Sequence, residues 1–196
     1  MRSTVSNNLK YLVGSYILML SVIFILPLYS LDEYSILTNT TSHLGAQNTP
    51  NSCIMNMTFA SLAFTSIWVG WRFLGKYWFQ KIALLVFGMA LLMTAIFQHA
   101  PIDVTLEYNI KEDQLHSLFA TITGFSFSVL AVSIGLVTKG KSHKVLAFIV
   151  TILAPLLSAL MFYEPTENWM GVWQRFIFIG MFGWMIYAFK NYELKI

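Results

Sequence analysis

The chain of 196 residues is 57% hydrophobic and only 11% charged, and its formal net charge is +3. Soluble globular domains carry about 25% charged residues, so a soluble domain of this length is excluded. The excess of positive charge does not indicate nucleic-acid binding, because the basic residues form no continuous stripe of the kind that such binding needs.

Six stretches of the chain are long and apolar enough to cross a membrane as helices. A span needs roughly 20 mainly apolar residues to cross a hydrocarbon core of about 30 Å. Backbone polar groups in lipid must be satisfied within the segment, which favours helices and excludes an open sheet. We therefore predict an all-α fold, with one domain over residues 1–196. The predicted spans are 11–30, 53–75, 82–100, 117–138, 145–163 and 172–189.

The charged residues predict how this bundle is oriented. Short cytoplasmic loops of membrane proteins are enriched in Lys and Arg. If both termini are cytoplasmic, ten of the 12 basic residues and only one of the nine acidic residues fall on the inner side. Lys111 and Arg175 are the two basic exceptions. We therefore expect the polar site of the protein at the extracytoplasmic ends of the helices.

The first outer loop, residues 31–52, contains a run of small polar residues. Such a run could fold back over the helix ends as a lid, and an ordinary solvated loop is the alternative. This loop carries Ser42 and His43.

Histidines and an aspartate suggest a metal site at the outer ends. His99 is expected at the end of the third span and His116 at the start of the fourth, with Asp103 between them and His43 in the first loop. A catalytic zinc ion takes three nitrogen or oxygen ligands and leaves a fourth position for water. We therefore predict a site for zinc or another divalent metal ion. Because the spacing matches no standard zinc signature, histidines that only hydrogen-bond to neighbours are the alternative.

Two acids next to His116 have competing interpretations. Asp113 and His116 are three residues apart and would share one helix face, so Asp113 or Asp103 could orient the imidazole. Alternatively, Glu112 and Asp113 stabilise the N-terminus of the fourth helix through its macrodipole. We favour the second interpretation.

Arg175 lies near the outer end of the last span. Charges within a membrane usually face a bundle interior or a polar cavity, although an arginine at this depth can also snorkel outward. If it faces inward, its planar guanidinium suits the carboxylate or phosphate of a lipid headgroup. Gln174 and Asn56, which should also face protein, complete the candidate ligand-binding residues.

Four short motifs follow one another at the outer helix ends. They are Ser42-His43-Leu44-Gly45, Pro101-Ile102-Asp103, His116, and Gly171-Val172-Trp173-Gln174-Arg175. In this order the chain resembles a prokaryotic family of polytopic membrane proteins catalogued as domain of unknown function 998. The resemblance covers almost the whole chain and implies a multi-pass protein of the prokaryotic plasma (cytoplasmic) membrane. It selects Ser42, Asp103, His116 and Arg175 without assigning them roles, whereas His43 and His99 depart from the family pattern.

The leading hypothesis for function is a membrane-embedded hydrolase or transferase that acts on a lipid or another amphiphile. A metal ion held by His99, His116 and Asp103 would activate water, with Arg175 neutralising an anionic group. A metal-free version uses His116 as general base and Ser42 as nucleophile.

The alternative hypothesis is a non-catalytic membrane protein that binds a lipid or small ligand and whose polar cluster is structural. Transport is disfavoured, because no span carries an acid or a histidine at mid-depth. The expected partner is the lipid bilayer, with no nucleic acid, and the sequence leaves the oligomeric state open.

Overall fold

Six long α-helices make up most of the chain in the computed structural model, which describes residues 2–195 apart from the side chains of residues 2–7, 164, 165 and 167. By length and composition, all six can cross a membrane, which confirms the predicted all-α class and the number of spans. They are α1 (Arg2–Ile25), α3 (Ser52–Phe73), α4 (Trp78–Ile96), α5 (Ile110–Val137), α6 (Lys141–Leu160) and α7 (Met170–Asn191).

Three short helical elements lie between the long ones. The 3₁₀-helix η1 (Leu26–Tyr29) directly follows α1, where Pro27 cannot donate a backbone hydrogen bond and the α-helix ends. The single-turn helix α2 (Thr41–Leu44) lies in the loop between η1 and α3. A second 3₁₀-helix, η2 (Glu164–Trp169), precedes α7.

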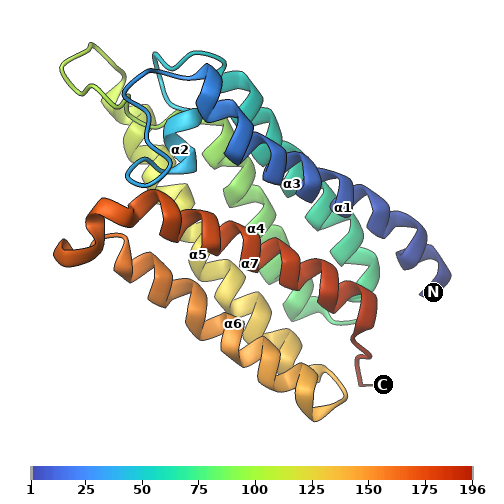
Figure 1. Cartoon of the computed structure of the whole chain (residues 1–196). Helices are drawn as coiled ribbons and strands as arrows, with labels where there is room; N and C mark the ends of the chain where they lie inside the picture. Colours follow the sequence, from blue (N-terminus) through green and yellow to red (C-terminus); the bar gives the residue numbers. More distant parts are fainter. Residues whose placement is uncertain (1, 196) are drawn as a thin grey trace.

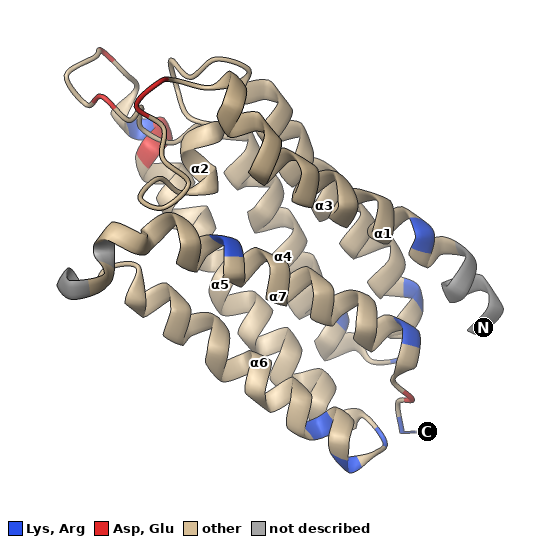
Figure 2. Cartoon of the chain, viewed as in Figure 1, with Lys and Arg blue, Asp and Glu red and all other residues tan. Residues whose placement is uncertain are grey.

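Charged side chains segregate to the two ends of the bundle. Figure 2 shows Lys and Arg gathered at the end that carries both chain termini, and nearly all the coloured Asp and Glu residues at the opposite end. We call these the basic end and the acidic end. Lys111, in the first turn of α5, and Arg175, in the second turn of α7, are the basic residues near the acidic end. The segregation follows the pattern of the positive-inside rule, and the cytoplasmic location of the basic end stays a prediction.

The six long helices form a closed ring. From α3 to α7 each helix packs on the next, and α1 packs on both α3 and α7 (Figure 1). Fully buried aromatic rings from four helices fill the interior: Phe59, Phe87, Phe127 and Phe182. The ring centroid of Phe87 is 6.0 Å from that of Phe127 and 6.1 Å from that of Phe182. Since lipid is as apolar as these side chains, close packing holds such a bundle together.

The boundaries of α4 and α5 differ from the predicted spans in a way that matters for the site. Helix α4 ends at Ile96, so His99 lies beyond the helix and not on its last turn. Helix α5 begins at Ile110, seven residues before the predicted span. The side chain of Asn109 caps it by accepting from the backbone N–H groups of Lys111 (3.1 Å) and Glu112 (3.3 Å). A capped polar turn is stable as helix but is too polar to be recognised as part of a membrane span.

Candidate functional site

The segment between η1 and α3, residues 30–51, folds back over the acidic end of the bundle (Figure 1). We call this segment the cap. Its single-turn helix α2 packs on α3 and α7, and Thr41, Ser42 and Leu44 are buried there. The lid-like interpretation of the loop is therefore the one that the structure shows.

Arg175 points into the protein and holds the cap from the α7 side. Its side chain is only 3% exposed, so it does not snorkel outward. All three guanidinium nitrogens donate hydrogen bonds of 2.6–3.3 Å. The acceptors are the backbone carbonyls of Ile23, Ile36, Asn39 and Gly171 and the hydroxyl of Tyr34. The planar fork of arginine suits several acceptors at once, and here it joins α1, the cap and α7.

The other members of the last motif complete this clamp. A side chain at Gly171 would collide with the carbonyl oxygens of Ile36 and Asn39, so only glycine lets the cap backbone lie on the first turn of α7. One turn further along, Gln174 Oε1 accepts from both the N–H and the hydroxyl of Thr41, each at 2.6 Å. Gln174 therefore binds α2 directly.

Tyr34 links the arginine to the cap backbone. Its hydroxyl accepts from Arg175 and donates to the carbonyl of Thr40 at 3.0 Å. Burial raises the pKa of Tyr34, and the charge of Arg175 acts in the opposite direction. A neutral phenol fits this position because it must donate as well as accept.

Two amide side chains hold the cap from the α3 and α4 side. Asn56 and Gln98 both donate to the carbonyl of Gly45, at 3.0 and 3.4 Å. A side chain at Gly45 would collide with Asn56 Oδ1, which explains the glycine of the first motif. Asn56 thus faces protein, as predicted, and its partner is the cap.

The cap brings Ser42 onto His116. The Nδ1 atom of His116 lies 2.9 Å from the carbonyl oxygen of Phe97 and 3.0 Å from that of Thr94. These carbonyls belong to the last turn of α4, where helix carbonyls lack intrahelical partners. Since carbonyl oxygens only accept, Nδ1 carries the proton. In the neutral ring Nε2 is then an acceptor, and Ser42 Oγ lies 3.0 Å from it.

Two further imidazoles lie near His116: His99 stacks on its ring, and His43 packs at a tilt on His99. The ring centroid of His99 lies 5.0 Å from that of His116 and 4.9 Å from that of His43. His99 Nδ1 is 2.6 Å from Asp113 Oδ1, and the same oxygen accepts from the N–H of Ala100 at 2.8 Å. Asp113 therefore orients His99. The expectation that Asp113 could orient His116 is not met, because the Nδ1 atom of His116 donates to the backbone carbonyls of Thr94 and Phe97.

Asp103 stands apart from these histidines. It is exposed, and its carboxylate accepts from the N–H (2.9 Å) and hydroxyl (2.6 Å) of Thr105 within the same loop. These hydrogen bonds lower the pKa of Asp103. Among the side chains that the structure describes, no group of three or more His, Cys, Asp or Glu is arranged to hold a metal ion. The structure thus does not bring Asp103 to the other predicted ligands.

His43 is held as a neutral ring. The backbone N–H of Thr40 donates to His43 Nδ1 at 3.1 Å, which requires an unprotonated nitrogen. Burial, followed by the neighbouring His99 and His116, lowers the pKa of His43 to about 4, although Asp113 acts in the opposite direction.

Tyr34 and Gln98 belong to this site but were not predicted from the sequence. Neither belongs to a motif, although both are polar residues close to one. The signal that could have found them is their position in an otherwise apolar chain, where a polar side chain near a helix end needs a protein partner.

Fold and site together define a multi-pass membrane protein in which a folded cap covers a polar network at one end of the bundle. A family model described as "Protein of unknown function (DUF998)" matches residues 13–189. The chain therefore belongs to this family. Comparison with curated proteins gave no match, and neither did comparison with solved structures.

We predict that Arg175→Lys strongly destabilises the protein. An ammonium has only three donors, so at least two of the buried acceptors lose their partner, at a cost of about 2 kcal/mol or more. The measurement is the free energy of unfolding in detergent micelles. Arg72→Lys is the matched control, because Arg72 is exposed and contacts the ring of Trp68. Equal, small effects of both substitutions would contradict the clamp.

We also predict that stability falls as the pH drops from about 6.5 to 4. In this range the unfolded state binds a proton at His43 that the folded state excludes, because the folded pKa is about 4. From pH 7 to pH 5 the loss is on the order of 2 kcal/mol. His43→Gln keeps an acceptor for Thr40 but does not titrate, so it should flatten this dependence. His143→Gln, at the basic end, should leave it unchanged. An unaltered slope in His43→Gln would disprove the assignment.

Proposed function

We propose that this protein is a membrane-embedded hydrolase or transferase that uses Ser42 as nucleophile and His116 as general base on a lipid or another amphiphile. One observation carries the proposal. Ser42 Oγ lies 3.0 Å from His116 Nε2, while the proton on the opposite ring nitrogen is held by the carbonyls of Thr94 and Phe97. A nucleophile within hydrogen-bond reach of an oriented base is the arrangement that activates a serine hydroxyl.

The chemistry that fits this pair is acyl transfer. His116 Nε2 takes the proton of Ser42 as Oγ attacks an ester carbonyl, and the imidazolium then donates that proton to the leaving alcohol as its C–O bond breaks. Water or an acceptor alcohol releases the acyl group from Ser42 by the reverse sequence. The carbonyls of Thr94 and Phe97 take the place of the acid in a catalytic triad. They fix the tautomer and stabilise the imidazolium through their dipoles.

The cap controls access to this pair. Ser42 is 7% exposed and His116 is 3% exposed, so a substrate reaches them only when α2 moves away from the helix ends. Arg175 and Gln174 act in this proposal by holding the cap. This replaces the expected role of Arg175 as a ligand for a lipid headgroup, because its three nitrogens already donate to protein groups.

We predict that an alkyl fluorophosphonate, which phosphonylates activated serines, labels Ser42 in the detergent-solubilised protein. Intact-mass analysis and peptide mapping give the extent and the position of labelling. Ser42→Ala and His116→Gln should abolish the label, whereas Ser142→Ala, which changes an exposed serine at the basic end, should keep it. Each variant is first checked for a monodisperse elution profile.

Absence of label from a folded wild-type protein, or equal labelling of Ser42→Ala, would contradict the enzymatic proposal. The non-catalytic alternative would then hold. It is favoured by the complete set of hydrogen bonds that Ser42, His116 and Arg175 make within the protein, since a fully satisfied buried network can fix helix register without chemistry.

Hydrogen bonding also bears on the metal hypothesis. His99 donates from Nδ1 to Asp113, which leaves Nε2 with a lone pair, the usual arrangement of a metal-binding histidine. His43 is in the opposite tautomer, because its Nδ1 accepts from Thr40, and His116 Nε2 faces Ser42. In their neutral forms two of the predicted histidines, His99 and His116, therefore keep a lone pair on Nε2, and that of His116 already accepts from Ser42.

From this arrangement we predict less than about 0.2 equivalents of zinc or another transition metal per chain after dialysis, since two histidines, one of them already hydrogen-bonded to Ser42, do not make the three-ligand site of a catalytic zinc. Elemental analysis by mass spectrometry measures the content, with His99→Ala and the control His143→Ala beside the wild type. About one equivalent in the wild type and in His143→Ala, but not in His99→Ala, would overturn the metal-free mechanism.

A further inference from the structure

A groove between α3 and α4 opens on the membrane-facing side of the bundle near the acidic end. Its volume is about 340 Å³, which lies within the range of roughly 300–1,000 Å³ typical of small-molecule sites. Both walls belong to spans that are long and apolar enough to cross the membrane. Because both helices can cross the membrane, we expect lipid around the opening of the groove. Small side chains of the two facing helices, Ala60 and Ala95, line it.

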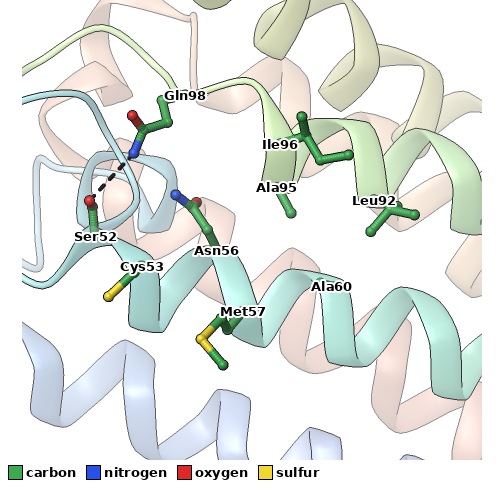
Figure 3. A pocket seen from close by; sticks show the side chains of 9 residues that line it. All are labelled: Ser52, Cys53, Asn56, Met57, Ala60, Leu92, Ala95, Ile96 and Gln98. Carbon is green, nitrogen blue, oxygen red and sulfur yellow. Dashed lines mark hydrogen bonds between the residues drawn. The ribbon is translucent and has the colours of Figure 1, made fainter.

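The groove changes from polar to apolar along its length. Figure 3 shows Ser52, Asn56 and Gln98 at one end, and Ala60 and Leu92 toward the other. Ser52 Oγ accepts from Gln98 at 3.4 Å, so the hydroxyl proton of Ser52 can be donated to a ligand. The order of these residues matches one chain of a membrane lipid, whose carbonyl lies at the interface and whose methylenes lie deeper.

The polar end of the groove is also the floor of the cap. Asn56 and Gln98 donate to the carbonyl of Gly45, and the N–H of Gly45 donates to the carbonyl of Ser42 at 3.0 Å. A lipid carbonyl at this end would therefore lie beside the segment that carries the nucleophile. Binding of an acyl chain in the groove and movement of the cap would therefore both involve Asn56 and Gln98.

We propose that the α3–α4 groove binds one acyl chain of a membrane phospholipid and presents its ester to Ser42. The inference rests on the proposed function and makes it more specific, because it names the class of substrate. Ser52 and the second amide N–H of Asn56 would donate to the ester carbonyl, while Ala60, Leu92 and Ala95 contact the chain. When α2 moves, the ester of the bound lipid reaches Ser42 while the lipid stays in the membrane.

The test is photocrosslinking with a phosphatidylglycerol that carries a diazirine in one palmitoyl chain, in detergent–lipid micelles, with mapping by mass spectrometry. We expect adducts concentrated on the groove-lining stretches of α3 and α4. Ala60→Trp, which fills the groove, should lower them roughly tenfold, the kind of loss expected when a hydrophobic subsite is blocked. Ala120→Trp, on an exposed position of α5, should leave them unchanged.

Cys53 provides a second blocking experiment that does not depend on refolding a variant. It is the one cysteine of the chain, it is exposed and it lines the groove. Alkylation of the folded protein with cyclohexylmaleimide should lower groove adducts to the same extent. The same treatment of Cys53→Ser should have no effect.

Adducts spread evenly over the lipid-facing helices, or unaffected by both Ala60→Trp and alkylation, would overturn the acyl-chain site. Adducts obtained with diazirine palmitic acid but not with the phospholipid would also overturn it. Ser42→Ala separates the two proposals, because groove adducts should persist in that variant. If they persist while the wild type resists the fluorophosphonate, the lipid site stands and the catalytic proposal fails.

Discussion

The buried guanidinium of Arg175 is the interaction on which the acidic end of the bundle depends. A positive charge that is 3% exposed near the end of a membrane span is costly unless polar groups surround it. Here carbonyl dipoles and a phenol do so, and no described carboxylate lies among its hydrogen-bond partners. Two of these carbonyls belong to the cap, at Ile36 and Asn39. The charge can therefore be buried only while the cap is folded. In turn, the hydrogen bonds that Arg175 donates to the cap carbonyls hold the cap in place.

The remaining geometry follows from the position of the cap. Glycines at 45 and 171 let its backbone approach α3 and α7 closely, and Gln174 and Asn56 hold the segment between them from opposite sides. This places Ser42 against the His116 ring, whose other nitrogen is fixed by α4. One set of backbone and side-chain hydrogen bonds thus does two things. It closes the end of the bundle, and it sets the tautomer that a base for Ser42 requires.

The sequence alone predicted the six spans and the charge segregation, because hydropathy and charge act locally along the chain. It placed Glu112 and Asp113 at the N-terminus of the fourth helix, as the structure has them, although the apolar span alone began at 117. It missed α2, which is too short to show periodicity. For the site, Ser42 with His116 was one of two mechanisms considered, and the direction of Arg175 was left open. Only the folded cap shows that Arg175 points inward and that Ser42 lies against His116. The favoured placement of Asp113 in the first turn of the fourth helix agrees with the structure. Its contact with His99 was not predicted, because one helix face does not reveal the neighbouring loop. The backbone carbonyls of Thr94 and Phe97 carry no sequence signal at all.

The most direct test of the central claim is nuclear magnetic resonance of the four histidine rings in protein labelled with ¹⁵N at the imidazole nitrogens, with His116→Gln used for assignment. At neutral pH the account predicts that His116 is a single neutral tautomer with its proton on Nδ1 and with Nε2 accepting from Ser42. The Nε2 resonance should then shift in Ser42→Ala while the Nδ1–H signal stays. A proton on Nε2, or an Nε2 resonance indifferent to Ser42→Ala, would contradict the pairing of Ser42 with His116.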